Sequence, residues 1–315
     1  MIPKQDLGQR RDNVFLNALR RMRKEKWLYI LLVPGIIYYV LFVYKPMWSI
    51  LIAFQNFSIT RGIWGSEWVG LKHFERFVTS MWFGTLFRNT VVLAVLNLIF
   101  YFPAPIILAL LLNELRHQRF KRMIQSLTYL PHFLSWVVIV SMFQQLLTVE
   151  NGTVNILLNK IGFETVPFLQ STNWFRPVIL IQIIWKEVGW GTIIFLAALS
   201  GVDVSLYEAA IVDGANHRQQ LWHITLPGIR GTIITLLILR MGNFMNTGFE
   251  QIYLMTNSMN RDVAEVFDTY VYRLGIGGGQ FSYSTAVGLF KSIIGLVLVT
   301  VSDRIAKHVG EEGIL

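Results

Sequence analysis

The sequence predicts an all-α polytopic membrane protein with six transmembrane helices and with both termini on the cytoplasmic side. Three observations predict this: low charge, long uncharged apolar runs, and basic residues concentrated at the flanks of those runs. Only 15% of the 315 residues are charged, whereas a soluble domain is usually about 25% charged. Several uncharged runs approach the roughly 20 residues that a helix needs to cross a bilayer.

The N-terminal residues 1–26 are predicted to be a cytoplasmic segment separate from the membrane domain, residues 27–315. Basic residues alternate there with Val14, Phe15 and Leu19 at roughly helical spacing. The pattern fits a basic amphipathic segment at the membrane surface and fits a solvated tail without fixed structure equally well. The apolar run that follows is long and lacks a small-residue cleavage site, so we interpret it as a retained anchor.

Hydrophobicity divides the membrane domain into six spans, which are separated by polar or aromatic-rich stretches. The second and third spans carry no charge but contain Pro103, Pro105 and Pro131, which predict kinks. The glycine cluster 275–279 predicts an external turn before the last span. The predicted spans cover about 27–54, 89–113, 123–148, 174–199, 231–255 and 283–302.

The short loop 113–122 sets the orientation of the spans. It contains four basic residues and one acidic residue, which the positive-inside rule places in the cytoplasm together with the basic N-terminus. Two spans separate these segments, so the two assignments agree.

Charged residues within the later spans include Lys186, Glu187, Arg240 and Lys291. Charges at membrane depth are costly and usually face a water-filled cavity or a partner. We therefore expect the C-terminal half to line most of a translocation pathway. The alternative is that Glu187 neutralises Arg240 or Lys291 and holds helices together.

Motifs for chemistry on the chain itself are not found in the sequence. It has no cysteine, no Gly-Lys-Ser/Thr phosphate loop and no His-Glu-x-x-His motif. The basic residues flank apolar runs instead of forming a face that would bind nucleic acid. We expect no catalytic residue, no metal site and no cofactor on this chain.

The polar loop 201–229 carries the most specific pattern. Ser205 is a candidate cap for a short helix, Glu208 suits the positive end of its dipole, and Pro227 is expected to end a second helix. Gly214 permits a sharp turn between the two helices. The pattern fixes seven identities at set spacings: Glu208, Ala209, Ala210, Gly214, Ile224, Leu226 and Pro227, with Asp213 beside the glycine.

This pattern resembles the EAA loop of binding-protein-dependent ABC importer permeases. Residues 249–256, 269–272 and 286–291 are similar to carbohydrate-uptake class 1 permeases, in particular the subgroup for polysaccharide fragments such as pectin- and alginate-type oligosaccharides. The resemblance implies the type I ABC importer fold in the bacterial plasma membrane. In the family, the EAA loop docks on the ATPase, so Glu208 is expected to make the ionic contact.

The same resemblance implies the partners of the chain. They are a second homologous permease, two ATP-binding cassette subunits that hold ATP and Mg²⁺, an extracytoplasmic binding protein, and the surrounding membrane lipid. The cargo is expected to be an oligosaccharide, including acidic ones, and no nucleic acid partner is expected.

Comparison with the maltose permease of the same class implies a set of substrate contacts on the helices before and after the EAA loop. A charged pair replaces the small or apolar residues of that relative, which favours a larger or charged ligand. For each aromatic, packing or anchoring at the membrane interface is an alternative. The implied contacts are Trp185, Lys186, Glu187, Trp190, Met241, Asn243, Met245, Asn246 and Gly248.

Two other classes of function compete with the importer. In an ion-coupled secondary transporter, the charges at membrane depth would couple solute to protons, but such folds often show two similar halves and none is apparent here. A membrane-embedded enzyme or scaffold would need a catalytic cluster or a large soluble domain. The EAA pattern has no role in either.

Overall fold

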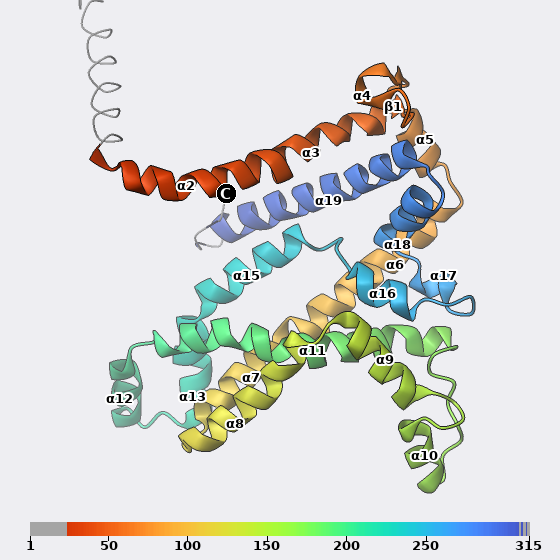
Figure 1. Ribbon diagram of the computed structural model, residues 1–315. Coiled ribbons are helices and arrows are strands. Elements are labelled where there is room, and N and C mark those ends of the chain that lie inside the picture. Colours follow the sequence, from red (N-terminus) through yellow and green to blue (C-terminus); the bar gives the residue numbers. More distant parts are fainter. Residues whose placement is uncertain (1–23, 309, 311–312, 314–315) are drawn as a thin grey trace, which may run out of the picture.

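The structure, a computed structural model, describes residues 24–308, 310 and 313. The predicted basic segment at residues 1–26 therefore lies almost entirely outside the described residues. The regular structure of the described chain is helical apart from one antiparallel pair, β1 (Gln55–Asn56) with β2 (Glu67–Trp68). The all-α prediction is confirmed (Figure 1).

Four continuous helical stretches are long and apolar enough to cross a membrane: Lys26–Phe54, Trp82–Glu114, Thr172–Ser200 and Phe281–His308. Two bent pairs of helices raise the number to six if each pair is one span. The continuous stretches are made of α2 (Lys26–Tyr38), α3 (Lys45–Met47) and a 3-10 turn (Trp48–Phe54); α6 (Trp82–Leu96) and α7 (Pro103–Glu114); α11 (Thr172–Ser200); and α19 (Phe281–His308).

The predicted third span corresponds to one bent pair, whereas the predicted fifth span, 231–255, shares only residues 231–242 with the other pair, whose first half belongs to the predicted coupling loop. The third bends by 102° between α8 (Gln118–Tyr129) and α9 (Trp136–Leu147), where Pro131 lies in a 3-10 turn (Leu130–Phe133). The other pair bends by 56° at Ile229. Its helices are α13 (His217–Gln220), α14 (Leu226–Gly228) and α15 (Arg230–Gly242), and the chain then leaves the helix until α16 (Phe249–Met255). The predicted range 231–255 thus contains two helices.

Three prolines are accommodated by π-helical turns instead of sharp kinks. The residue before each proline donates its N–H five positions back: Lys45 to Val40, Phe102 to Asn97, and Leu226 to Leu221. A proline ring clashes with the carbonyl four residues earlier in a regular α-helix, and the wider π turn relieves that clash. The helical stretches containing Pro46 and Pro103 therefore continue as single spans.

The two ends of the molecule differ in what they carry (Figure 1). At one end, called the coupling-loop end, lie α12 (Val204–Val212), α13, the start of α2 and the end of α19. The opposite end, called the hairpin end, carries the β pair and several short helices. These are α4 (Gly62–Gly65), α5 (Lys72–Val78), α10 (Thr153–Lys160) and α17 (Arg261–Ala264), and α18 (Phe267–Tyr272) leads from there into α19.

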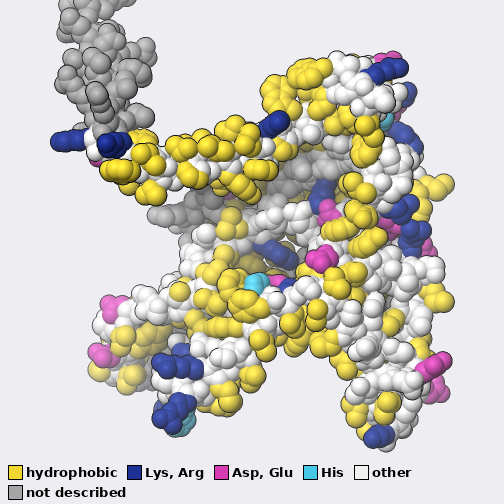
Figure 2. Space-filling view, viewed as in Figure 1, with side chains coloured by type: hydrophobic (Ala, Val, Ile, Leu, Met, Phe, Trp, Pro, Cys, Tyr) yellow, Lys and Arg dark blue, Asp and Glu magenta, His cyan; other side chains and the backbone are white. Residues whose placement is uncertain are grey.

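Three apolar clusters form the core. One joins α9, α11 and α16 around Ile179 and Ile252, a second surrounds Phe77 and Phe267, and the third lies near the coupling loop. In contrast, the most apolar window of the stretch Lys26–Phe54 has no buried residue, and its apolar side chains cover that helix in Figure 2. This window therefore exposes its side chains to lipid or to a partner, whereas Ala53 near the end of the stretch is buried.

Candidate coupling loop and substrate pathway

The loop 201–229 folds into two short helical arms joined at a left-handed glycine. At the end of α12, Ala215 N–H donates to Ala210 O and Gly214 N–H donates to Ile211 O, which is a Schellman closure. Gly214 has φ of 78°, a conformation that favours glycine. The predicted sharp turn between two helices is therefore present.

Each arm begins with its own cap. The carboxylate of Asp203 accepts the Ser205 N–H at 2.9 Å at the start of α12, and this bond is the main cause that lowers the pKa of Asp203 below its usual range. Asn216 and Gln219 form a reciprocal capping box on α13. These caps fix where the two arms begin.

Three details of the predicted loop are corrected. Asp203 is the N-cap, and Ser205 lies inside the helix that it was expected to cap. Glu208 lies beyond the first turn of α12, so the dipole of the helix is not the reason for its position. Pro227 lies at the start of α14, and the arm ends two residues later at Ile229.

The first arm protrudes from the molecule and exposes the predicted contact residues. No residue of α12 is buried; Glu208, Ala209, Asp213 and Gly214 are exposed, and Ala210 is half-buried. Val212, at the tip, is 87% exposed. Exposed apolar patches mark interaction sites for proteins or membranes, so docking of this arm on an ATPase stays a prediction. Val204, Leu206, Ile211 and Trp222 are the other exposed apolar side chains of this surface.

The second arm is tied to the first arm and to the membrane helices. Tyr207 Oη lies 2.9 Å from Thr225 Oγ1, which links the arms, and His217 Nε2 lies 2.5 Å from Glu114 Oε2 at the end of α7. Ile224 and Leu226 are half-buried beside this link, whereas Pro227 is exposed. Below the arms, a third core cluster packs α7, α11 and α15 together; its buried residues are Ala109, Phe195, Leu199 and Ile229.

In the middle of the molecule, Lys186 has a structural role. Its side chain is 8% exposed, and Nζ donates to His132 O at 2.7 Å and to Leu134 O at 2.6 Å. Both carbonyls belong to the 102° bend of the third span, where the backbone lacks helical partners. The ammonium group therefore satisfies the broken backbone, while its role in the substrate pathway stays a prediction.

Glu187 and Trp190 meet the same bend from α11. Glu187 Oε2 lies 2.8 Å from His132 Nδ1, and the ring of Trp190 stacks on the imidazole with centroids 4.4 Å apart. Trp190 is 46% exposed and Trp185, which packs on Phe143, is 37% exposed. Charged and His side chains gather in the middle of the face in Figure 2.

Among the described residues, Glu187 forms no ion pair with Arg240 or Lys291, which is the pairing that the alternative interpretation supposed. Glu187 contacts His132 and Lys186, whereas Lys291 forms an ion pair with Asp268 of α18. The guanidinium of Arg240 lies 5.3 Å from the ring centroid of Tyr101. The sequence interpretation missed His132 and Asp268, because one is a lone histidine after a proline and the other lies in a segment assigned to the exterior.

The break in the predicted fifth span separates the remaining candidates. Asn243 and Asn246 are exposed and joined by a hydrogen bond of 3.0 Å, whereas Met245 is 3% exposed and belongs to the core. Met241 is half-buried on α15, and Gly248, with φ of 89°, begins α16. Of these residues, Asn246 lines a cavity of about 740 Å³ that also borders Asp268 and Lys291.

Comparisons with known proteins agree with this architecture. The family described as "Binding-protein-dependent transport system inner membrane component" matches residues 102–311. Protein LplB of Bacillus subtilis (strain 168) is 55% identical over 95% of this chain and 94% of its own length. The polygalacturonan/rhamnogalacturonan transport system permease protein YteP of the same organism is 54% identical over 94% of this chain and 92% of its own length.

A solved structure has the same fold. It is a chain of a bacterial alginate ABC transporter in complex with an alginate pentasaccharide-bound periplasmic protein, with a TM-score of 0.87 and 36% sequence identity. The likeness covers 94% of this chain and 99% of that chain. The family match, the two relatives and the shared fold give one conclusion: this chain belongs to the inner membrane components of binding-protein-dependent transport systems, the permeases predicted from the EAA loop.

Proposed function

We propose that this chain is one of two permease subunits of an ATP-driven importer that takes up acidic oligosaccharides delivered by an extracytoplasmic binding protein. Two relatives support the cargo: one is a polygalacturonan/rhamnogalacturonan permease, and the other comes from an importer of alginate. Both polymers consist of or contain sugar acids. Pectin- or alginate-derived fragments are therefore the cargo to test first.

In this proposal, the exposed coupling loop transmits movement of the ATPase to the membrane helices. Its protruding arm places Glu208 and the apolar tip at Val212 where another protein can bind. The two arms are cross-linked by Tyr207 and Thr225 and rest on the cluster that joins α7, α11 and α15. Movement of a docked ATPase would therefore reach three membrane helices as a unit. ATP and Mg²⁺ would bind to two separate ATPase subunits, and this chain would hold no cofactor.

The proposed direction places the coupling-loop end in the cytoplasm and the hairpin end outside. The start of α2 and the end of α19 lie at the coupling-loop end (Figure 1), so the described ends of the chain share one side. The basic residues of α8 and the preceding loop lie there too, as the positive-inside rule requires. The oligosaccharide would pass from the hairpin end, along the aromatic and amide residues near Trp190 and Asn246, to the cytoplasm.

The ion-coupled secondary transporter is the competing proposal. It requires a charge in the membrane that is free to bind and release a proton. Lys186 and Glu187 are both engaged by the bend of the third span, and a secondary transporter has no use for a docking arm. These contacts favour the ATP-driven importer.

The test is Glu208→Ala in the assembled transporter. Loss of a charge-assisted contact costs about 1.5–3 kcal/mol, and each 1.4 kcal/mol is about tenfold in an equilibrium constant. We therefore expect at least tenfold lower uptake of trigalacturonate into proteoliposomes that contain ATP. The matched control is Glu164→Ala, an exposed acid on the loop after α10 at the hairpin end.

The outcomes separate the two proposals. Reduced uptake and weaker binding of the ATPase in the Glu208 variant, with a normal control, would support the importer. Uptake that continues without ATP but requires a proton gradient would support the secondary transporter. Normal uptake by Glu208→Ala would contradict the docking role of the loop.

A further inference from the structure

A second cavity lies at the hairpin side of the membrane helices, away from the coupling loop. It has a volume of about 530 Å³, within the roughly 300–1,000 Å³ range of ligand pockets. The sequence interpretation assigned no site to this region. Its lining comes from α16, α17, α18 and the turn after α18: Tyr253, Leu254, Thr256, Arg261, Glu265, Thr269, Tyr272, Arg273 and Gly277.

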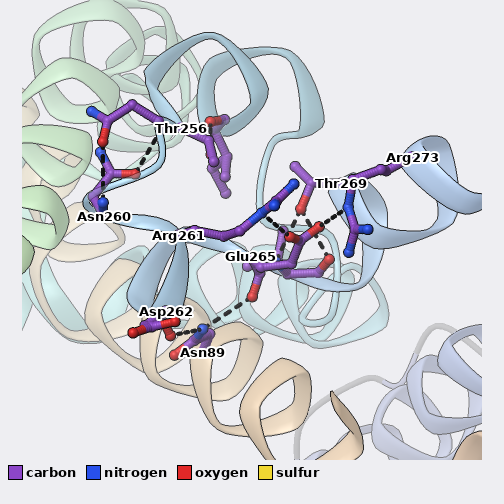
Figure 3. Close-up of polar contacts among 11 residues, drawn as sticks. Asn89, Thr256, Asn260, Arg261, Asp262, Glu265, Thr269 and Arg273 are labelled. Atoms are coloured by element: carbon purple, nitrogen blue, oxygen red, sulfur yellow. Dashed lines mark hydrogen bonds and ion pairs between the residues drawn. The ribbon is translucent and has the colours of Figure 1, made fainter. Parts of the chain in front are cut away.

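Two arginines converge on one buried carboxylate in this cavity (Figure 3). Arg261 Nε donates to Glu265 Oε2 at 3.0 Å, and Arg273 Nε donates to Glu265 Oε1 at 3.3 Å. The side chain of Glu265 is 3% exposed, whereas those of Arg261 and Arg273 are 46% and 35% exposed. The three groups together carry one net positive charge, which faces the cavity and favours an anion.

The guanidinium groups keep hydrogen-bond donors for a ligand. A guanidinium has five N–H donors in a planar fork, and the bonds described for each arginine within residues 24–308 use only its Nε. Arg273 lies over the rings of Trp82 and Tyr270, and its Nη2 is buried without a hydrogen-bond partner. Arg261 is the more exposed of the two, so its terminal nitrogens are the better placed donors.

The backbone around the two arginines is held in place. Asn89 of α6 donates from Nδ2 to Asp262 O at 2.8 Å and to Glu265 O at 3.0 Å (Figure 3). Asn89 itself is fully buried and accepts a bond from Arg176 Nη2 of α11. The site is therefore anchored to two membrane helices, which reduces the loss of conformational freedom when a ligand binds.

Three aromatic rings connect this cavity to the 740 Å³ cavity beside Lys291. Phe249, Tyr253 and Tyr272 form a cluster with ring centroids 5.0–5.4 Å apart. Tyr253 lines the arginine cavity, Phe249 lines the other cavity, and Tyr272 lines both. Aromatic rings between polar groups are suited to the apolar faces of sugar rings. An oligosaccharide could thus contact both cavities along one aromatic wall.

We propose that the cavity of Arg261 and Arg273 is a binding site for the carboxylate of a sugar acid at the outer mouth of the pathway. The terminal guanidinium nitrogens of Arg261 bind the carboxylate in a bidentate manner, as planar guanidinium groups do. Glu265 orients both arginines, and Tyr253 and Tyr272 contact the sugar ring. This inference rests on the proposed function, because it supposes that acidic oligosaccharides are the cargo.

The site explains charge recognition without Lys186, whose ammonium group is buried and bonded to two carbonyls. Arg261, in contrast, is accessible. Arg261 and Arg273 together carry two positive charges, of which Glu265 neutralises one. Selectivity for acidic over neutral sugars is therefore assigned to the outer cavity.

The experiment measures ligand binding to the assembled transporter in nanodiscs of zwitterionic lipid, without binding protein, so that no anionic headgroup competes. The probes are trigalacturonate and its uncharged methyl ester. The variants are Arg261→Gln and Arg261→Lys, and the control is Lys160→Gln, an exposed cation at the end of α10. A thermal unfolding scan of each variant verifies that the assembly is folded.

We expect the parent to bind trigalacturonate about tenfold more tightly than the ester. Arg261→Gln should remove this difference without changing affinity for the ester, Arg261→Lys should keep part of it because a point charge replaces a bidentate fork, and Lys160→Gln should keep all of it. Full preference for trigalacturonate in Arg261→Gln would overturn the site. In that case the parent would still take up trigalacturonate in the uptake assay. Failure of the site and failure of the proposed function are therefore distinguishable.

A second measurement separates sugar binding from docking of the binding protein. Stimulation of ATP hydrolysis is measured with binding protein loaded with trigalacturonate and with empty binding protein. If Arg261→Gln weakens only the stimulation by loaded protein, the result supports carboxylate binding. If it weakens both equally, the cavity docks protein and the proposal is wrong.

Discussion

At the scale of single residues, the surroundings of a charge decide its role more than its depth in the membrane. Lys186 lies in the middle of a span and is 7% exposed, with two carbonyl acceptors. Arg261 lies at the edge of the helices, and nearly half of its side chain is exposed. A buried cation with matched acceptors stabilises a fold, whereas an exposed fork with unused donors can bind a ligand.

The role of Lys186 leads to a stability prediction. Lys186→Met keeps an unbranched side chain of similar length, one atom shorter, and leaves the carbonyls of His132 and Leu134 without this donor. Each unsatisfied buried polar group costs about 1–3 kcal/mol, so we expect a clearly lower Tm of the solubilised assembly. Lys160→Met on α10 should leave the Tm unchanged. A normal Tm combined with selective loss of acidic substrates would instead make Lys186 a pathway residue.

Sequence reasoning was better at locating the local EAA pattern than at predicting which side chains contact one another. The seven fixed residues of the EAA pattern were found because their spacing is local, and Gly214 adopts the predicted turn. The cap was assigned to Ser205 although Asp203 makes it, because both residue types fit an N-cap and the choice depends on where the helix begins. The Glu187–His132 contact joins residues 55 positions apart, which hydropathy alone does not reveal.

At the scale of elements, length and composition predicted the four continuous spans better than the two bent ones. The second, fourth and sixth spans are continuous helices close to the predicted ranges. The third turns through 102° after Phe133, a few residues beyond Pro131, while Pro103 and Pro46 leave their helices continuous through π turns. Proline alone therefore does not decide where a span bends. At this bend, Lys186 satisfies the carbonyls of His132 and Leu134, which hydropathy does not reveal.

The coupling loop gives a prediction at the element scale. Gly214→Ala places a side chain in a left-handed conformation, at a cost of about 1–2 kcal/mol, although nothing lies within 4 Å of the added methyl group. We expect the arm to be disordered more often and ATP-dependent uptake to fall severalfold, with insertion unchanged. Gly201→Ala is the matched control, because Gly201 has φ of −88° and ends α11 in the same loop.

One outcome would contradict the prediction for Gly214. If Gly214→Ala and Gly201→Ala reduce uptake equally, the angle at Gly214 does not control the arm. Crosslinking of the ATPase to the loop compares the same two variants without a transport assay. A disordered arm should crosslink less efficiently, so Gly214→Ala should give the lower yield.

At the scale of the whole molecule, the two ends have opposite kinds of surface. The coupling-loop end presents an apolar tip beside an acid, and the hairpin end presents the arginine cavity. Between them, the stretch Lys26–Phe54 has no buried residue in its most apolar window. The last turn of this stretch packs on α19, whereas the exposed part before it is suited to lipid on one face and to a partner permease on another. Only the assembly would complete the pathway.

The proposed orientation can be measured directly because the sequence contains no cysteine. Val212→Cys places one thiol at the tip of the coupling loop, where Val212 is 87% exposed. Glu164→Cys places one on the exposed loop after α10 at the hairpin end. Both variants would be expressed with the second permease but without the ATPase, so that the tip stays uncovered.

A membrane-impermeant maleimide should label Glu164→Cys in cells whose outer barrier has been removed and should label Val212→Cys only after the inner membrane is opened. This result follows if the basic residues near α8 hold the coupling-loop end inside, and the cysteine-free parent sets the background. Labelling in the reverse pattern would invert the direction of transport. It would also move the arginine cavity to the cytoplasm, where it could not receive a sugar acid from a binding protein, so the orientation is the step on which both proposals depend.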